Sequence, residues 1–486
     1  MSLRSKLQSA LPKTAFWRNL TLVAGGTAIG QAASILASPI LTRLYGPKDF
    51  GVLAVYAALT GLGGVISSLA YQQAIPVPSD DRDAARVAVV ATIGTVASGL
   101  LTFFVVLLTR SHIDSWLRTP GLSRYYWLVP LGATGLGAYE ILSQWAARKK
   151  AFDVIGNTSA ARSMVQVASQ LLGGFTGLGT TGLIVGQLLG QWTGSLRVLR
   201  ARFRVDTDQF RGLRARELWA SALRYRKFPL FTAPAALLNA FDSNAPPLLF
   251  AYFFGSTVTG YFALGHRLLA IPFWLIASSA QKVFFPAAAK ALHDGRLAEE
   301  TQLTFRRLIC LVLPMVTLLA ACAPDTFSVL MGSQWREAGV YMQWLSLRTC
   351  FTLLVFPLMP LLYVLERQAV GTLFNGLQLV VRVSAILIGT HYQDPLLSIM
   401  LLGSCTGLMW LMFLGYLLVA SGNSLLGAVQ RFALEGAIAA ALAAPVVLVK
   451  LGHASPLIVT GVAGFMGVVA LLVIWRRVPG FMGRSG

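Results

Sequence analysis

Residues 37–81 read ASPILTRLYGPKDFGVLAVYAALTGLGGVISSLAYQQAIPVPSDD. A turn that contains Arg43 and Lys48 leads into residues 51–75, which carry no charged side chain, and the stretch closes on Asp80 and Asp81. A helix that crosses a membrane needs about 20 consecutive, mostly apolar residues. The stretch therefore predicts one membrane crossing between two polar turns.

The same alternation of apolar runs and polar turns continues along the 486 residues of the chain. The chain is 55% hydrophobic and 12% charged, whereas soluble domains are about 25% charged. These values predict an all-α integral membrane protein with about 14 transmembrane helices, and a count of twelve is the alternative. The predicted spans are 20–41, 51–75, 87–109, 125–146, 157–178, 180–199, 228–254, 258–284, 305–324, 338–364, 368–390, 395–420, 430–449 and 455–475.

Basic residues account for the formal net charge of +21 and predict the orientation. With the N-terminus in the cytoplasm, 29 of the 40 Lys and Arg residues fall in or beside cytoplasmic gaps, and seven fall in external gaps. Because cytoplasmic loops are enriched in Lys and Arg, both termini are predicted to be cytoplasmic and the span count to be even. The charge therefore requires no nucleic acid as a partner. The first apolar run is long and many others follow it, so we expect no cleavable signal peptide.

An internal repeat predicts two lobes. The motif aromatic-Gly-x4-Gly-x-x-Ala occurs at Tyr45 and again at Phe254, an offset of 209 residues, and both copies begin on the same predicted side of the membrane. This pattern favours a parallel repeat of six spans each. The basic segment between them predicts a helix that lies on the membrane surface, with a plain determinant of topology as the alternative. The predicted parts are an N-terminal six-helix lobe (1–199), a basic cytoplasmic linker (200–227), a C-terminal six-helix lobe (228–420), and two additional transmembrane helices with a basic tail (421–486).

Several polar side chains fall inside the predicted spans, where an ionisable group is costly and usually faces a cavity or a partner. Arginine binds phosphate oxygens in a bidentate manner and stays charged, and amide groups suit hydroxyl-rich ligands. A lumen lined by these groups predicts an anionic cargo that bears sugar. The candidate substrate-binding residues are Arg267, Arg348, Arg382, Asn239 and Gln72.

Two buried acids and one proline pair have candidate roles in transport. Asp242 and Glu140 are candidates for coupling a proton or a sodium ion, and a structural ion pair is the alternative for such deep charges. Pro246 and Pro247 are hinge candidates, because proline removes a helical hydrogen bond. A static kink is the alternative.

The motifs of several other protein classes do not occur. The four cysteines and five histidines are dispersed, so the sequence favours neither a metal site nor a disulfide framework. There is no P-loop, HExxH or GxSxG motif, and no predicted external loop is long enough for a catalytic domain. We expect a protein that is not an enzyme, uses no cofactor and binds no metal.

Four stretches carry a resemblance to a known family. The first is residues 37–81; the others are RYRKFPLFTAPAALLNAFDSNAPPLLFAYFFG (224–255), GYFALGHRLLAIPFWLIASSAQKVFFPAAAK (260–290) and MGSQWREAGVYMQWLS (331–346). Together they cover about a quarter of the chain, and they resemble Wzx-type polysaccharide flippases of the MOP superfamily. One departure is Ala70-Tyr71-Gln72, where relatives tend to have a charged Arg-Tyr-Glu-like run. A role for those charges therefore cannot be carried over.

The resemblance implies a fold, a cargo and partners. The fold would have two six-helix lobes in a pseudo-twofold arrangement around a central cavity, as in MATE transporters. The cargo would be undecaprenyl-pyrophosphate-linked oligosaccharide repeat units, moved across the bacterial inner (cytoplasmic) membrane by alternating access for O-antigen lipopolysaccharide, capsule or exopolysaccharide. Membrane lipids, a polysaccharide polymerase and a chain-length regulator are the implied partners. Arg267 lies within the matching YFALGHRLL run and is the best carried-over cavity residue.

Other functions stay open at this point. A MATE-type cation-coupled antiporter of small molecules would be expected to have an acidic cavity, whereas this chain has more arginines than acids inside its spans. A membrane polysaccharide polymerase or ligase would be expected to carry a long external loop. A scaffold for glycan assembly would not need deep charged residues, and lipid II transport fits the motifs less well.

Overall fold

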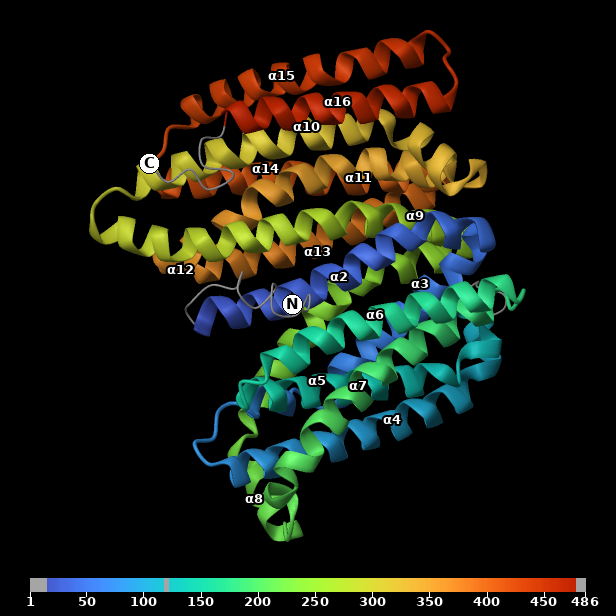
Figure 1. Cartoon of the computed structure of the whole chain (residues 1–486), viewed down its shortest axis with the longest axis vertical. Coiled ribbons are helices and arrows are strands. Elements are labelled where there is room, and N and C mark those ends of the chain that lie inside the picture. The colour runs from blue at the N-terminus through green and yellow to red at the C-terminus, as the bar shows by residue number, and fades with distance from the viewer. Residues whose placement is uncertain (1–14, 118–121, 478–486) are drawn as a thin grey trace, which may run out of the picture. The chain divides into compact units, whose positions relative to one another are not determined.

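The computed structural model describes residues 15–117 and 122–477, and every regular element among them is helical (Figure 1). The described residues of the first unit, which extends to Thr259, form seven complete α-helices. They are α2 (Ala15–Leu44), α3 (Pro47–Ser67), α4 (Asp81–Leu117), α5 (Leu128–Arg148), α6 (Phe152–Phe175), α7 (Thr180–Phe210) and α8 (Ala215–Arg224). The predicted all-α fold is therefore confirmed for the described residues.

The second unit begins at Gly260 and contains the remaining helices. They are α10 (Leu297–Met331), α11 (Arg336–Val355), α12 (Leu361–Val364), α13 (Gln368–His391), α14 (Pro395–Ala420), α15 (Leu425–Leu451) and α16 (Pro456–Arg477). In this unit α15 and α16, the last two helices, both pack against α10 (Figure 1).

Helix α9 (Ala233–His293) belongs to both units. It contains two of the predicted spans and leaves helical geometry at Gly255, where φ is 82°. The first half of α9 is attached to α3 in the first unit: a Cβ on Gly61 would lie 3.1 Å from Oδ1 of Asn244, and one on Gly51 would lie 1.7 Å from the carbonyl oxygen of Ser256. These close contacts explain why the boundary between the two units falls within α9; the predicted division into lobes and a linker stays a prediction.

Each of the fourteen predicted spans overlaps at least one helix of the structure, although the helix of span 51–75 ends at Ser67 and span 338–364 is divided between α11 and α12. Ten helices among the described residues are long and apolar enough to cross a membrane, and these ten do not include α5, α6 and α7. The protein is therefore a multi-pass membrane protein, and the count of fourteen spans stays a prediction.

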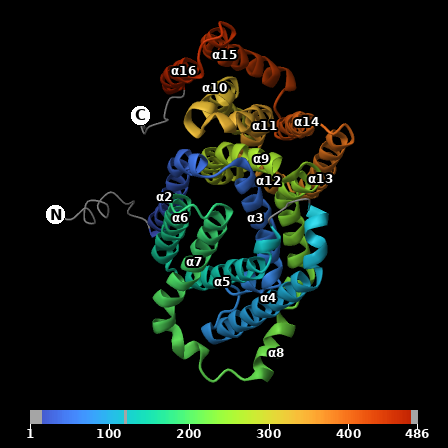
Figure 2. The same cartoon turned by 90° about the vertical axis from the view of Figure 1, so that its right-hand side faces the viewer.

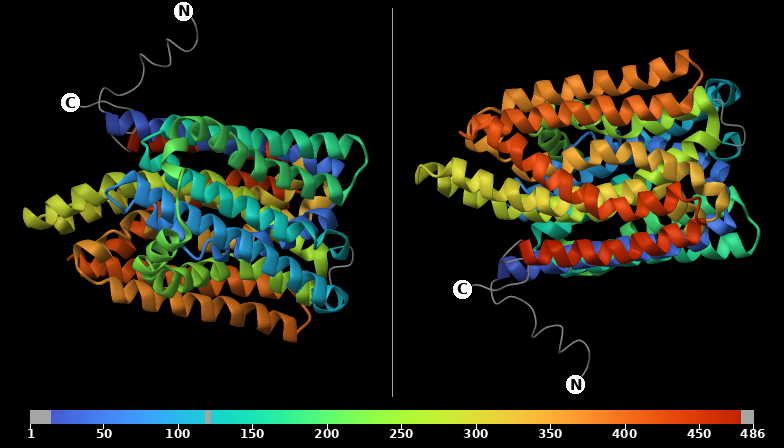
Figure 3. Two further views of the ribbon diagram at one scale, coloured as in Figure 1. Left: turned by 90° about the horizontal axis from the view of Figure 1, so that it is seen from below. Right: turned by 90° about the horizontal axis from the view of Figure 1, so that it is seen from above.

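Close backbone packing joins α7 to its neighbours. A glycine stripe, Gly182, Gly186, Gly190 and Gly194, runs along α7 and faces α5 and α6. A Cβ on Gly190 would lie 3.0 Å from the carbonyl oxygen of Arg162 on α6. Small residues let spanning helices approach closely, and Figure 3 shows α6 and α7 side by side in green.

The predicted basic linker is well structured. Helix α7 extends into it as far as Phe210, and α8 packs against the start of α4 (Figure 2). Asp83 accepts hydrogen bonds from Ser221 at 3.2 Å, from Arg224 at 3.2 Å and from the hydroxyl of Tyr225 at 3.1 Å. Burial and the Asp83 carboxylate raise the pKa of Tyr225.

Helix α8 also carries exposed apolar side chains. Trp219 is 68% exposed and Leu223 is 49% exposed, although α8 is anchored to α4 through the Asp83 contacts. An amphipathic helix with an exposed tryptophan and flanking arginines is typical of a helix in the membrane interface. This geometry agrees with the predicted surface helix.

Candidate functional site

Three basic side chains of the second unit, on α9, α11 and α13, interact electrostatically. His266 on α9 interacts electrostatically with both Arg348 and Arg382, and its ring stacks on that of Phe262 at 5.6 Å with an interplanar angle of 20°. Arg382 is buried, Arg348 is half-buried and His266 is exposed. The structure therefore brings together two arginines predicted from the sequence and a histidine that the sequence analysis did not select. We call His266, Arg348 and Arg382 the basic cluster.

Glycine contacts fix the helices that carry the basic cluster. A Cβ on Gly265 of α9 would lie 2.8 Å from the carbonyl oxygen of Ala338 on α11. A Cβ on Gly403 of α14 would lie 2.3 Å from the carbonyl oxygen of Trp344, also on α11. The backbones of α9 and α14 therefore both lie in close contact with that of α11. Such tight packing makes α11, which carries Arg348, rigid.

Gln378 adds a neutral polar group beside the basic cluster. It lies on α13 one helical turn before Arg382, so both side chains lie on the same face of the helix. Gln378 is only 3% exposed, and neither its amide nitrogen nor its amide oxygen has a hydrogen-bond partner among the described residues. An amide can donate and accept at once, and a buried amide without partners costs free energy. Gln378 is therefore suited to a ligand with hydroxyl groups.

Arg267 follows His266 directly on α9 and is half-buried. Consecutive residues of an α-helix project about 100° apart, so Arg267 points away from the direction of His266. Among the residues that the structure describes, no acid lies within ion-pair distance of Arg267. Its predicted role in the cavity stays a prediction.

The two acids predicted to couple an ion lie in the first unit. Glu140 on α5 interacts electrostatically with Arg162 on α6, and the Arg162 guanidinium lies 5.0 Å from the centre of the Tyr139 ring. Glu140 therefore has a cationic neighbour, which agrees with the alternative that this acid forms a structural ion pair and does not couple an ion. Asp242 lies on α9 and is half-buried.

The predicted amide ligands and hinge prolines lie in different surroundings. Asn239 is exposed on α9. Gln72 is buried in the 3-10 turn Tyr71–Ala74 after α3, where its amide oxygen accepts a hydrogen bond from the Ser68 hydroxyl. Pro246 and Pro247 lie in a helical stretch of α9, and the break in that helix is at Gly255. Their predicted roles in substrate binding and bending stay predictions.

Metal ligands do not gather in the described part of the chain. There, no group of three or more His, Cys, Asp and Glu side chains could hold a metal ion. The basic cluster and Gln378 instead offer guanidinium, imidazole and amide groups. The chemistry that they offer is recognition of anions and hydroxyl groups.

Comparison with solved structures identifies the class of fold as that of MOP-superfamily transporters. The chain matches a lipid II flippase MurJ in an inward closed conformation over 93% of its own length and 98% of that chain, with a TM-score of 0.71 at 11% identity. It also matches an inward-facing MATE multidrug resistance transporter of the MOP superfamily over 85% of its length and 95% of that chain, with a TM-score of 0.55 at 16% identity. At such low identities the likeness concerns the fold alone.

The chain belongs to the family described as Polysaccharide biosynthesis protein, whose model matches residues 40–340. A curated relative is the succinoglycan biosynthesis transport protein ExoT of Rhizobium meliloti (strain 1021), which is 25% identical over 321 residues. That alignment covers 62% of this chain and 59% of the relative, so the chain spans under two thirds of the relative's length. The predicted resemblance to a family of polysaccharide biosynthesis proteins is confirmed by this match, and the predicted MOP-type fold by the solved structures.

Proposed function

We propose that the protein is a flippase that moves undecaprenyl-pyrophosphate-linked oligosaccharide repeat units across the bacterial inner membrane. The observation that carries this proposal is the basic cluster with Gln378 beside it, within helices that cross the membrane. Guanidinium groups bind phosphate oxygens in a bidentate manner and keep their charge. The arginines of the cluster would hold the pyrophosphate, and Gln378 would bond sugar hydroxyls.

Electrostatics favours an anionic ligand over a cationic one. Two guanidinium groups and an imidazole that approach one another repel, and this repulsion is stronger at low dielectric than in water. A bound pyrophosphate would offset that repulsion, whereas a cationic drug would add to it. The alternative of a MATE-type antiporter rests on a likeness of fold alone and fits this charge pattern less well.

Transport would follow alternating access, with the prenyl tail remaining in the lipid. The positive-inside pattern supports cytoplasmic termini, and the family resemblance implies a path from the cytoplasmic leaflet to the periplasmic leaflet. Arg267 would line the same path, and Asp242 or Glu140 would couple an ion. The name of the relative, a succinoglycan biosynthesis transport protein, supports exopolysaccharide export as the pathway. A polysaccharide polymerase and a chain-length regulator would then act on the delivered units.

Depletion of the protein tests the proposal while the upstream glycosyltransferases stay active. Mass spectrometry of extracted undecaprenyl-linked glycans should then show one complete, unpolymerised repeat unit accumulating on the cytoplasmic face. Accumulation on the periplasmic face would indicate a polymerase or a ligase. An unchanged lipid-linked pool, with polysaccharide still reaching the surface, would favour the antiporter.

Variants assign the effect to the proposed site. Arg382→Gln should fail to restore export although the variant inserts normally, and Arg296→Gln should restore it. Arg296 is an exposed arginine that forms an ion pair with Glu299. Arg267→Ala should also lose export, and normal export by a well-folded Arg267→Ala protein would remove that residue from the mechanism.

A further inference from the structure

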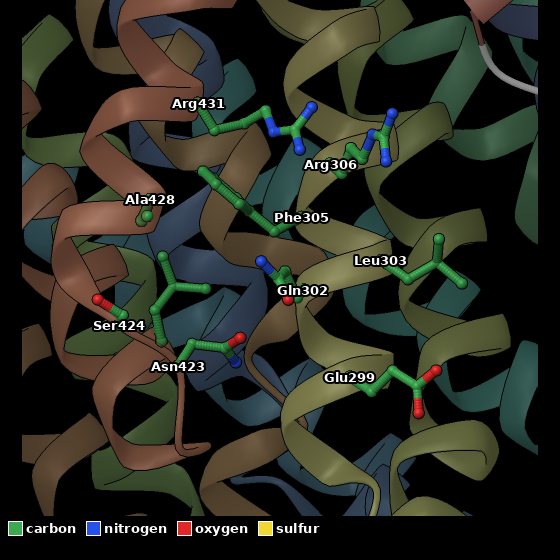
Figure 4. Close-up of a pocket in the computed structure, with 11 residues that line it drawn as sticks. Glu299, Gln302, Leu303, Phe305, Arg306, Asn423, Ser424, Ala428 and Arg431 are labelled. Carbon is green, nitrogen blue, oxygen red and sulfur yellow. The ribbon is translucent and has the colours of Figure 1, made fainter.

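A second polar site lies at one end of the second unit, away from the helical turn that holds Arg382. A pocket of about 230 Å³ opens between the first turns of α10, the end of α14 and the start of α15. Figure 4 shows Arg306 of α10 and Arg431 of α15 reaching toward the same end of it. Gln302, Asn423 and Ser424 supply further polar groups along its wall.

The two arginines are available to a ligand. Among the described residues, neither Arg306 nor Arg431 forms an ion pair. Glu299 also lines the pocket, but Figure 4 places it at the opposite end, and its carboxylate is bonded to Arg296 at 2.9 Å. The end of the pocket where the arginines meet is therefore positively charged.

The start of α15 adds to this positive potential. The helix has 27 residues, and Ser424 at its N-cap position donates or accepts no side-chain capping bond. The N-terminus of a helix carries a partial positive charge and free amide groups, both of which favour an anion. Two guanidinium groups, a helix N-terminus and neutral amides together are suited to a phosphate group.

The surroundings of the pocket indicate which phosphate it takes. Leu303 of the pocket wall is exposed, as are Leu425, Leu426 and Val429 on the first turns of α15. Both α10 and α15 are long and apolar enough to cross a membrane, so this apolar surface meets acyl chains directly beside the polar pocket. The predicted topology assigns the gaps before α10 and before α15 to the cytoplasmic side, where basic pockets between spanning helices are typical sites for anionic headgroups.

We propose that Arg306, Arg431 and the start of α15 form a specific site for the phosphate headgroup of an anionic phospholipid, whose acyl chains cover Leu425, Leu426 and Val429. The lipid bridges α10 to the junction of α14 and α15 and so stabilises the attachment of the last two helices. This site is independent of the transported cargo, and its occupancy does not depend on the flippase proposal.

The test measures thermal unfolding of the purified full-length protein in neutral detergent. Phosphatidylglycerol, phosphatidylcholine and inorganic phosphate are added separately, and phosphatidylglycerol retained through detergent washing is counted by native mass spectrometry. We expect phosphatidylglycerol alone to raise the Tm. Each basic residue near a membrane surface contributes about 1 kcal/mol, so the Arg306→Gln/Arg431→Gln double variant should bind it roughly 30-fold more weakly.

Arg307→Gln is the matched control. Arg307 is exposed on the same helix, carries the same charge and does not line the pocket. The control should keep the rise in Tm. An equal loss in Arg307→Gln would reduce the effect to general surface charge and overturn the proposal.

Two further outcomes would also overturn the proposal. An equal shift with inorganic phosphate would make the pocket a site for a free anion, and an equal shift with phosphatidylcholine would remove the need for negative charge. If the double variant does not fold, the single variants replace it, and each should bind phosphatidylglycerol about 5-fold more weakly.

Discussion

A substitution of Gln378 tests the proposed ligand site, because it should raise the stability of the protein and lower its transport activity. Its side chain is 3% exposed, and both amide atoms lack a partner among the described residues. Leaving a buried polar group unsatisfied costs about 1–3 kcal/mol. Methionine has nearly the same length and no hydrogen-bonding requirement, so Gln378→Met should stabilise the substrate-free protein by roughly that amount.

Gln170 provides the matched control for this change. It is a buried glutamine on α6, at 2% exposure, but its amide nitrogen donates to the carbonyl oxygen of Leu183 at 3.1 Å. Gln170→Met removes that bond and should destabilise the protein by about 1 kcal/mol. The same substitution at two equally buried glutamines should therefore move stability in opposite directions.

The assay is thermal unfolding of purified protein in one detergent, together with export in cells. One kcal/mol corresponds to about 2–4 °C in domains of 150–250 residues, so Gln378→Met should raise the Tm by at least about 2 °C. Export should fall, because the sugar loses its amide partner. A lower Tm would mean that Gln378 is already bonded in the folded protein and would refute the reasoning. Unchanged export would separate Gln378 from the cargo.

Three further predictions concern packing and ion pairs. Gly403→Val should destabilise the protein by at least about 2 kcal/mol, because the new Cβ would lie 2.3 Å from a backbone oxygen. Gly464→Val, with nothing within 4 Å of the new Cβ, is the control, and equal Tm values would contradict the packing. Arg477→Met should cost up to about 3 kcal/mol, because Glu435 is 1% exposed and bonded to Arg477 at 2.7 Å. In the double variant, Glu435→Gln should recover most of the stability lost in Arg477→Met. If the Tm changes of the two substitutions were additive, the two side chains would not be coupled. Asp83→Asn should weaken the attachment of α8 to α4, because the Asp83 carboxylate accepts three hydrogen bonds from this segment. Amide hydrogen exchange of residues 215–225 should then be faster, and an unchanged exchange rate would show that other contacts attach α8.

The helices could be predicted because an apolar run of sufficient length is a local property of the chain. The break at Gly255 also falls inside the second copy of the repeated motif, where a turn was expected. The end of α7 and the boundary between the units were less predictable. The residues after 199 are mostly polar, yet they continue α7 as far as Phe210. The first half of α9 belongs to the first unit because Asn244 and Ser256 lie against Gly61 and Gly51, which are distant in the sequence.

The sequence predicted the types of residue in the candidate site but not which residues form it together. Arg348 and Arg382 were identified because a charge inside an apolar run is conspicuous. Their convergence on His266 depends on tertiary packing, and a lone histidine gives no local signal. Gln378 was missed for the same reason, since only its burial and lack of partners distinguish it from the other amides in the spans.

The packing around the basic cluster bears on where the protein can move. Gly265 and Gly403 hold α9 and α14 at backbone distance from α11, and such tight interfaces cannot slide without losing contact. The packing of α9 and α14 on α11 is therefore preorganised, and a rearrangement has to take place outside these two interfaces. Along α9, the backbone is helical at Pro246 and Pro247 and leaves helical geometry only at Gly255, close to the boundary between the two units. For the proposed alternating access, this favours bending at Gly255, where a residue without a side chain adopts a positive φ at little cost, over bending at the prolines.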